Sequence, residues 1–170
     1  MPITLAEINA LDPASFADAL AQIFEHSPWI PERAASARPF ADRAALHQAL
    51  CATLAAASEA EKLALIRAHP ELAGRAAMRK ELTPASASEQ HGAGLDRCSP
   101  QEFAQLTAAN AAYTARFGFP FIIAVKGHTR TSIISAIEQR LHNSSAEEFA
   151  TALEQIERIA ALRLAELVPE

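Results

Sequence analysis

A chain of 170 residues is within the usual range for one domain and is long enough to bury a substantial hydrophobic core. Hydrophobic residues make up 50% of the chain and charged residues 21%, a composition that excludes a disordered or fibrous protein. The formal net charge of −5 has the wrong sign for a general binder of nucleic acid or of anionic membranes. We therefore predict a soluble, folded protein with a single domain over residues 1–170.

The chain carries no signal for export or membrane anchoring. No Lys or Arg precedes Arg33, so the charged start of a signal peptide is missing. The most apolar run, residues 117–125, is less than half of the roughly 20 residues that a membrane-spanning helix needs. Cys51 and Cys98 form no C-x-x-C motif, which is typical of buried or idle thiols in a reducing compartment. These features predict a cytoplasmic protein.

Helix signals dominate the first half of the sequence. Asp12 and Pro13 are typical of an N-cap followed by proline at the first helical position, and they predict a helix whose apolar face reaches Phe24. The proline-containing segment 28–31 should break that helix. The apolar spacing over residues 40–54 then predicts a second, alanine-rich helix.

A third helix is predicted from the capping-box spacing of Ser58 and Glu61. It should end near His69, because the residue before a proline disfavours the helical conformation. From residue 74 to residue 98 the apolar pattern loosens. Proline and glycine residues there predict a loop that contains a short helix.

The second half of the chain continues in the same way. Residues 99–102 combine an N-cap, a first-position proline and a capping-box glutamate, and they predict the start of a further helix. Residues 117–125 lack helical spacing and predict an extended, largely buried connector. Residues 131–132 should open the next helix, and residues 144–145 a long terminal one. The predicted fold class is all-α, an irregular helical bundle.

No familiar cofactor motif is present. The histidines lack the spacings that would place two metal ligands on one helix face, so we predict no metal site. The sequence also lacks a G-x-S-x-G elbow, a P-loop and a dinucleotide fingerprint. The common cofactor and acyl-transfer chemistries therefore have no support in this sequence.

Four polar residues near helix ends admit both a structural and a functional interpretation. His69 precedes a proline that could point the imidazole into a cleft, but a histidine also suits the negative end of a helix dipole. Glu89 has capping-box spacing from Ser86. Arg140 and Arg163 are each typical of a solvated charge that complements a helix dipole. Taken singly, none of these residues predicts an activity.

Several longer segments share their order along the chain with one enzyme family. They are Arg38-Pro39-Phe40, His69-Pro70-Glu71-Leu72-Ala73-Gly74, Ser86-Ala87-Ser88-Glu89-Gln90, Gly92-Ala93-Gly94-Leu95, Phe117-Gly118-Phe119-Pro120-Phe121-Ile122-Ile123, Arg140-Leu141, and Ile159 with Leu162-Arg163-Leu164. In these segments the chain resembles the 2-oxo-4-hydroxy-4-carboxy-5-ureidoimidazoline (OHCU) decarboxylases. The matches span most of the chain, so chance agreement is a poor explanation.

The resemblance implies an all-α, usually homodimeric enzyme of urate breakdown. Such an enzyme converts OHCU into (S)-allantoin and carbon dioxide without a metal or an organic cofactor, and it needs no nucleic acid or membrane. The implied catalytic residues are His69, Glu89 and Arg163, with Arg140 as the alternative to Arg163. The implied substrate-binding residues are Pro70, Ser86, Ala87, Ser88, Glu89, Gln90, Phe121, Ile122, Ile123, Ala124 and Val125.

The chemistry of these residues agrees with the reaction. Loss of carbon dioxide leaves an electron pair that the conjugated ring of the substrate can accept, so no external electron sink is required. His69 suits the proton transfer, a step in which a positioned general acid or base typically contributes roughly 10²- to 10⁴-fold. Glu89 can fix the imidazole, bind the ureido N–H groups or repel the reacting carboxylate. Arg163 offers planar donors that match carboxylate or ring carbonyl oxygens.

Two departures from other family members bear on location. The sequence ends in Val168-Pro169-Glu170 rather than in the peroxisomal tripeptide of some members, and no hydrolase domain is attached to it. Both features lead us to expect a stand-alone cytoplasmic enzyme. Two other functions stay open: a lyase or hydrolase that acts on a related ureido acid, and a helical interaction module whose pocket has lost its activity.

Overall fold

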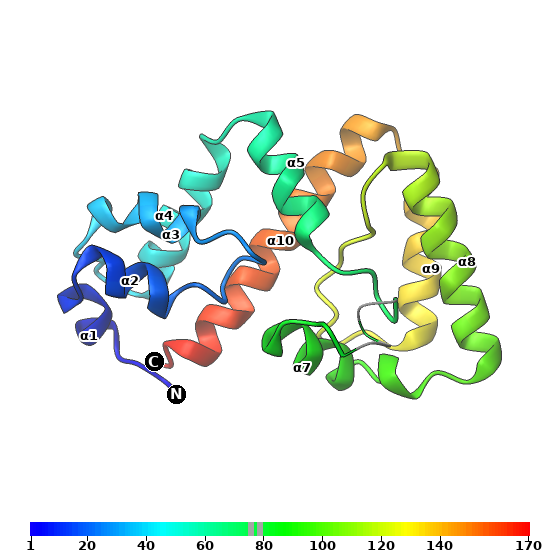
Figure 1. The fold of residues 1–170 in the computed structure, drawn as a ribbon, viewed down its shortest axis with the longest axis horizontal. Helices are drawn as coiled ribbons and strands as arrows, with labels where there is room; N and C mark the ends of the chain where they lie inside the picture. Colours follow the sequence, from blue (N-terminus) through cyan, green and yellow to red (C-terminus); the bar gives the residue numbers. More distant parts are fainter. Residues whose placement is uncertain (75–76, 78–79) are drawn as a thin grey trace. The chain divides into compact units, whose positions relative to one another are not determined.

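The structure, a computed structural model, describes residues 1–74, 77 and 80–170. These residues form helices and no β-strand, which confirms the predicted all-α class (Figure 1). The α-helices are α1 (Leu5–Ala10), α2 (Pro13–Ala19), α3 (Trp29–Ala34), α4 (Arg43–Ala55), α5 (Glu59–Ala68), α7 (Pro84–Gly92), α8 (Pro100–Phe117), α9 (Arg130–Arg140) and α10 (Ser145–Leu167). Two 3-10 helices are η1 (Ala35–Ala37) and η2 (Leu95–Arg97). None of the described helices is both long and apolar enough to cross a membrane.

The chain divides into two compact units. The first contains residues 1–65 and 157–170, and the second contains residues 66–156. Both boundaries fall inside helices, because residues 65 and 66 belong to α5 and residues 156 and 157 belong to α10. The single domain over residues 1–170 stays a prediction.

Capping residues determine several helix starts, as the sequence predicts. The carboxylate of Asp12 accepts hydrogen bonds from two backbone N–H groups in the first turn of α2. Ser58 and Glu61 bond to each other's backbone N–H at the start of α5. Ser99 and Glu102 form the same capping box before α8. Each box satisfies N–H groups that have no partner within the helix.

The first unit differs from the prediction in its short helices. α2 ends at Ala19, and residues 20–27 continue as turns, although Phe24 is buried as predicted. The segment 28–31 begins α3 instead of only breaking a helix. The physical reason is that proline lacks only the N–H, which has no partner in the first turn of a helix in any case. α1, which a capping box at Thr4 opens, was not predicted.

Two further helix starts correct the prediction. Phe40 lies outside α4, because Asp42 caps that helix by accepting a hydrogen bond from the N–H of Ala45. α9 begins earlier than residues 131–132, because Thr129 is its N-cap. The first error counts an apolar residue that precedes the cap, and the second is a choice among Thr129, Thr131 and Ser132, which are all chemically suited to cap a helix.

An aromatic cluster forms part of the core of the second unit. Tyr113 of α8 is fully buried, and its ring centroid lies 4.6 Å from that of Phe117 and 5.3 Å from that of Phe121. α8, which carries Tyr113 and Phe117, packs side by side with α9 (Figure 1). The cluster therefore ties the connector that follows α8 to the core.

The connector between α8 and α9 begins at a left-handed residue. Gly118 has a φ of 76° and is the C-cap of α8, a position that favours glycine because a Cβ is disfavoured there. Residues 119–125 have no regular secondary structure, and Phe121, Ile122 and Val125 are buried. This arrangement confirms the predicted connector, which starts one residue after the predicted position.

Candidate active site

His69 directly follows the last residue of α5, as the sequence predicts. Its exposed fraction is 7%, so the imidazole is largely shielded from solvent. The turn that follows is tight. Ala73 has a φ of 50°, and a Cβ added to Gly74 would lie 2.7 Å from the Cβ of Glu71. Glycine is therefore required at position 74, and the His69 turn (residues 69–74) has little freedom to take another form.

Two side chains from α7 and α8 hold the backbone of the His69 turn. Gln90 accepts a hydrogen bond from the N–H of Ala73 at 2.9 Å and donates one to the carbonyl of Glu71 at 3.4 Å. Asn110 donates to the carbonyl of Leu72 at 2.9 Å. Both side chains are buried, so these bonds are not exposed to competition from bulk water. The turn that carries His69 is thus fixed to two helices.

α7 contains the five consecutive residues that were predicted to bind substrate. Thr83 caps this helix, because its hydroxyl accepts a hydrogen bond from the N–H of Ser86 at 3.3 Å. The capping-box interpretation of Ser86 and Glu89 is therefore wrong, since both residues lie inside the helix. The five residues differ in burial: Ser86 and Gln90 are buried, Glu89 is half-buried, and Ala87 and Ser88 are exposed.

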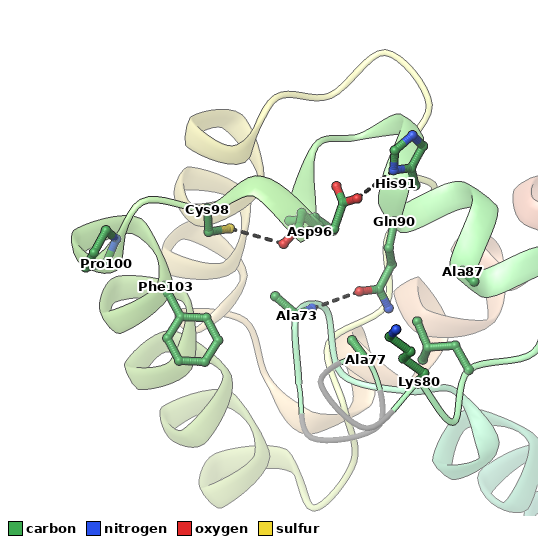
Figure 2. A pocket seen from close by; sticks show the side chains of 12 residues that line it. Ala73, Ala77, Lys80, Ala87, Gln90, His91, Asp96, Cys98, Pro100 and Phe103 are labelled. Carbon is green, nitrogen blue, oxygen red and sulfur yellow. Dashed lines mark hydrogen bonds and ion pairs between the residues drawn. The ribbon is translucent and has the colours of Figure 1, made fainter.

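A cavity of about 710 Å³ opens beside α7 (Figure 2). Ala87, Gln90 and His91 line it from one face of the helix, and η2 and the start of α8 contribute other walls. Ser86 and Glu89 are not among the described residues that line it. His69 is not among the described residues that line this cavity. The cavity is therefore distinct from the predicted catalytic set.

The predicted substrate-binding residues 121–125 lie in the connector, where two side chains hold the backbone. Arg140 of α9 donates from Nη1 to the carbonyl of Ile122 at 2.6 Å. Gln155 of α10 accepts a hydrogen bond from the N–H of Ala124 at 3.0 Å. Arg140 is only 13% exposed, so its interpretation as a solvated helix-end charge is wrong.

Arg163 is also buried, and it belongs to the first unit. Its side chain is 6% exposed, and Nη1 lies 3.1 Å from the carboxylate of Glu25. The same nitrogen donates to the carbonyl of Gln22 at 3.0 Å. Glu25 is itself buried. The interpretation of Arg163 as a solvated helix-end charge is wrong, because both members of this ion pair are removed from water.

The predicted catalytic residues fall in both units. His69, Glu89 and all the predicted substrate-binding residues belong to the second unit, whereas Arg163 belongs to the first. Within the second unit, Gln90 joins α7 directly to the His69 turn. The catalytic and substrate-binding roles themselves stay predictions.

Three supporting residues were not predicted. Asn110 had a usable signal, because it is a polar residue between Leu106 and Tyr113 on the buried face of α8 and must find a partner there. The sequence gives no such signal for Glu25 and Gln155, because each contacts residues that are distant in sequence.

The described residues include few groups suited to metal binding or to thiol chemistry. They contain no group of three His, Cys, Asp or Glu side chains that is arranged to hold a metal ion. Cys51 and Cys98 are unbridged. Burial raises the pKa of the Cys51 thiol to about 12, and the charge of Glu157 adds to this shift. This thiol is therefore protonated near neutral pH and is a poor nucleophile.

Comparison with known proteins points to one family. A family model described as OHCU decarboxylase matches residues 9–165. The 2-oxo-4-hydroxy-4-carboxy-5-ureidoimidazoline decarboxylase of Haloferax volcanii is 44% identical over 96% of this chain and 95% of that protein. The uric acid degradation bifunctional protein PucL of Bacillus subtilis is 40% identical over 98% of this chain, which corresponds to 33% of that protein. A crystal structure of OHCU decarboxylase in the presence of (S)-allantoin has a TM-score of 0.69 and 25% identity, and the match covers 85% of this chain and 93% of that one.

The family match includes the elements that carry the candidate site. Residues 9–165 contain the His69 turn, α7, the connector and Arg163. The similarity to the Haloferax protein extends over almost the full length of both chains. The chain therefore belongs to the OHCU decarboxylase family.

Proposed function

We propose that this chain decarboxylates OHCU to (S)-allantoin in urate degradation, without a metal or an organic cofactor. The observation that carries the proposal is the family match over residues 9–165, which includes His69, Glu89 and Arg163. The names of the relatives support the reaction and its place in uric acid degradation. The (S)-allantoin in the related crystal structure supports the product.

The reaction makes limited demands on the protein. Cleavage of the bond between the ring carbon and the carboxylate releases carbon dioxide and leaves its electron pair with the substrate. The conjugated ring accepts this pair. The protein has to orient the carboxylate, stabilise the resulting anion and deliver one proton to one face of the ring, which makes the product a single enantiomer.

His69 delivers the proton in this proposal. The buried His69 turn supports the assignment, because a side chain on a fixed backbone explores few orientations and a positioned general acid typically contributes roughly 10²- to 10⁴-fold. Imidazole also changes its charge near neutral pH. Glu89 accepts hydrogen bonds from the ureido N–H groups of the substrate, and Arg163 binds its carboxylate or ring carbonyl oxygens.

The proposal extends to location and assembly. The family resemblance supports a cytoplasmic homodimer that binds only its small substrate and product. Size-exclusion chromatography with light scattering tests the assembly, and the mass of a single chain of 18.2 kDa in solution would refute the homodimer.

The experiment that tests the activity uses OHCU generated freshly from urate by the upstream enzymes. Purified protein should accelerate the formation of (S)-allantoin, followed by circular dichroism, and a chelator should not change the rate. Loss of activity in chelator that a divalent ion restores would refute the metal-free mechanism. A rate equal to the uncatalysed rate would refute the proposed decarboxylase activity. In that case, turnover of a related ureido acid would indicate a lyase or hydrolase, and no turnover would indicate an inactive interaction module.

The His69→Asn variant tests the catalytic assignment. Asparagine keeps a polar side chain but cannot exchange a proton near neutral pH. We expect kcat to fall by about 10²-fold or more, while the helical circular dichroism and the affinity for allantoin persist. If His69 only complements the dipole of α5, the change should cost at most about 1 kcal/mol of stability and leave turnover intact. Normal turnover in a folded variant would remove His69 from the mechanism.

A further inference from the structure

The connector is held by its backbone from two different helices. The Ile122 carbonyl accepts a hydrogen bond from Arg140 on α9, and the Ala124 N–H donates one to Gln155 on α10. Neither bond is part of a helix or a sheet. Side chains that bond to backbone groups of an irregular segment fix its path directly, because such a segment has no hydrogen-bond pattern of its own.

The two bonds hold the backbone on either side of Ile123. From residue 120 to residue 125 the backbone has no helix and no turn, so no regular hydrogen-bond pattern fixes these residues. Arg140 and Gln155 therefore fix the positions of Ile122 and Ala124, and with them the position of Ile123.

Arg140 is itself held in the interior by Glu148, a fully buried carboxyl group. Glu148 accepts hydrogen bonds from Arg140 Nε at 2.6 Å, from Tyr113 at 2.5 Å and from Asn143 at 2.9 Å. Burial, and next the hydrogen bond to Glu148, raise the pKa of Tyr113 well above its usual range. The Tyr113 hydroxyl is therefore protonated and donates to Glu148 at any ordinary pH.

The remaining nitrogen of Arg140 also faces the interior. Nη2 has less than 1 Å² of accessible surface and no hydrogen-bond acceptor among the described residues. The guanidinium carbon lies 4.3 Å from the centroid of the Phe121 ring, a distance typical of a cation–π contact. The guanidinium group is thus engaged by Glu148, Ile122 and Phe121, and the side chain of Arg140 is only 13% exposed.

We propose that Arg140 and Gln155 are positioning residues, which fix the backbone of the connector at Ile122 and Ala124 so that residues 121–125 can meet the substrate. This inference rests on the proposed function, because it takes residues 121–125 as a substrate-binding segment. It also assigns Arg140 a role different from that of a substrate ligand. Gln155 is the better test of the two, because it is half-buried and its substitution leaves no charge without a partner.

The main test replaces Gln155 with Leu, which has a similar volume but no acceptor for the Ala124 N–H. Loss of one hydrogen bond should raise KM by about five- to tenfold with little change in kcat. Amide exchange in the peptide that contains Ala124 should become faster without any substrate. Gln155→Glu keeps an acceptor oxygen and should restore both values. Gln139→Leu is the matched control, because Gln139 is an exposed glutamine on α9.

Arg140→Lys tests the second contact, because lysine keeps the charge but cannot place two donors in the same planar geometry. It should also raise KM and speed amide exchange in the connector. Wild-type KM and exchange in folded Gln155→Leu would overturn the inference, and so would an equal change in Gln139→Leu. A wild-type protein that fails to turn over OHCU would instead refute the proposed function, and the exchange measurement would still decide whether Gln155 fixes the connector.

Discussion

Arg163 and Arg140 show how the partner of a single residue determines its role. Each arginine pairs with a buried carboxyl group, Glu25 for the buried Arg163 and Glu148 for the half-buried Arg140. Glu25 and Arg163 are 138 residues apart in sequence, so no local pattern indicates that they pair. The local sequence shows only that each arginine is near a helix end. A charged residue in that position is typically solvated. The interpretation of these arginines as solvated charges therefore failed because burial depends on the whole fold and not on neighbouring residues.

Arg163→Lys is the residue-scale prediction that separates a structural role from a substrate-binding role. Lysine keeps the charge but loses the rigid planar guanidinium, whose Nη1 donates to both Glu25 and the carbonyl of Gln22. The loss of hydrogen bonds to a charged group should cost about 1.5–3 kcal/mol of stability. If Arg163 also binds the substrate, KM should rise several-fold at a temperature where the variant is fully folded. Thermal unfolding and steady-state kinetics measure the two effects separately.

The matched control for this prediction is Arg158→Lys, which changes an exposed arginine five residues earlier on α10. It should leave both KM and the melting temperature close to the wild-type values. A folded Arg163→Lys variant with wild-type KM would restrict Arg163 to its pairing with Glu25, and another cation would then have to bind the substrate.

At the scale of the secondary-structure element, the caps explain both the successes and the errors of prediction. α5 and α8 start as predicted, because in each a serine and a glutamate three residues later satisfy backbone N–H groups locally. α7 was predicted only as a short helix in a loop. Its start depends on Thr83, whereas the nearby Ser86 and Glu89 have equally suitable spacing. Local chemistry thus predicts which residues can cap a helix, and packing selects among them.

Thr83→Val tests whether the cap of α7 matters for function. Valine keeps the shape of threonine but removes the hydroxyl that bonds to the Ser86 N–H, so the change should cost about 1 kcal/mol of stability. Because α7 contains Ser86, Glu89 and Gln90, fraying of its first turn should also lower kcat/KM several-fold. Melting temperature and kcat/KM are the two measurements.

Thr4→Val provides the control, because Thr4 caps α1 in the same way and α1 contains none of the predicted site residues. It should lower stability by a similar amount and leave kcat/KM unchanged. Equal activity in both folded variants would show that the start of α7 does not contribute to the site.

At the scale of the whole molecule, the two compact units share continuous helices. One boundary falls within α5, and the other falls within α10 between residues 156 and 157. α10 contributes Gln155 to the second unit and Arg163 to the first. If either unit unfolded alone, the backbone hydrogen bonds that cross these points would have to break within a helix. Helix formation is cooperative, so such interruptions are unfavourable.

We therefore predict that the chain unfolds in a single transition. The protein supplies its own probes, because its only tryptophan, Trp29, is in the first unit and its only tyrosine, Tyr113, is in the second. Trp29 fluorescence, near-ultraviolet absorbance of Tyr113 and helical circular dichroism should give the same midpoint in urea. The calorimetric and van't Hoff enthalpies should agree at about 120 kcal/mol, as expected for 170 residues from the usual enthalpy per residue. A Trp29 midpoint that differs from the Tyr113 midpoint would show that the two units unfold independently and would refute the prediction of a single domain.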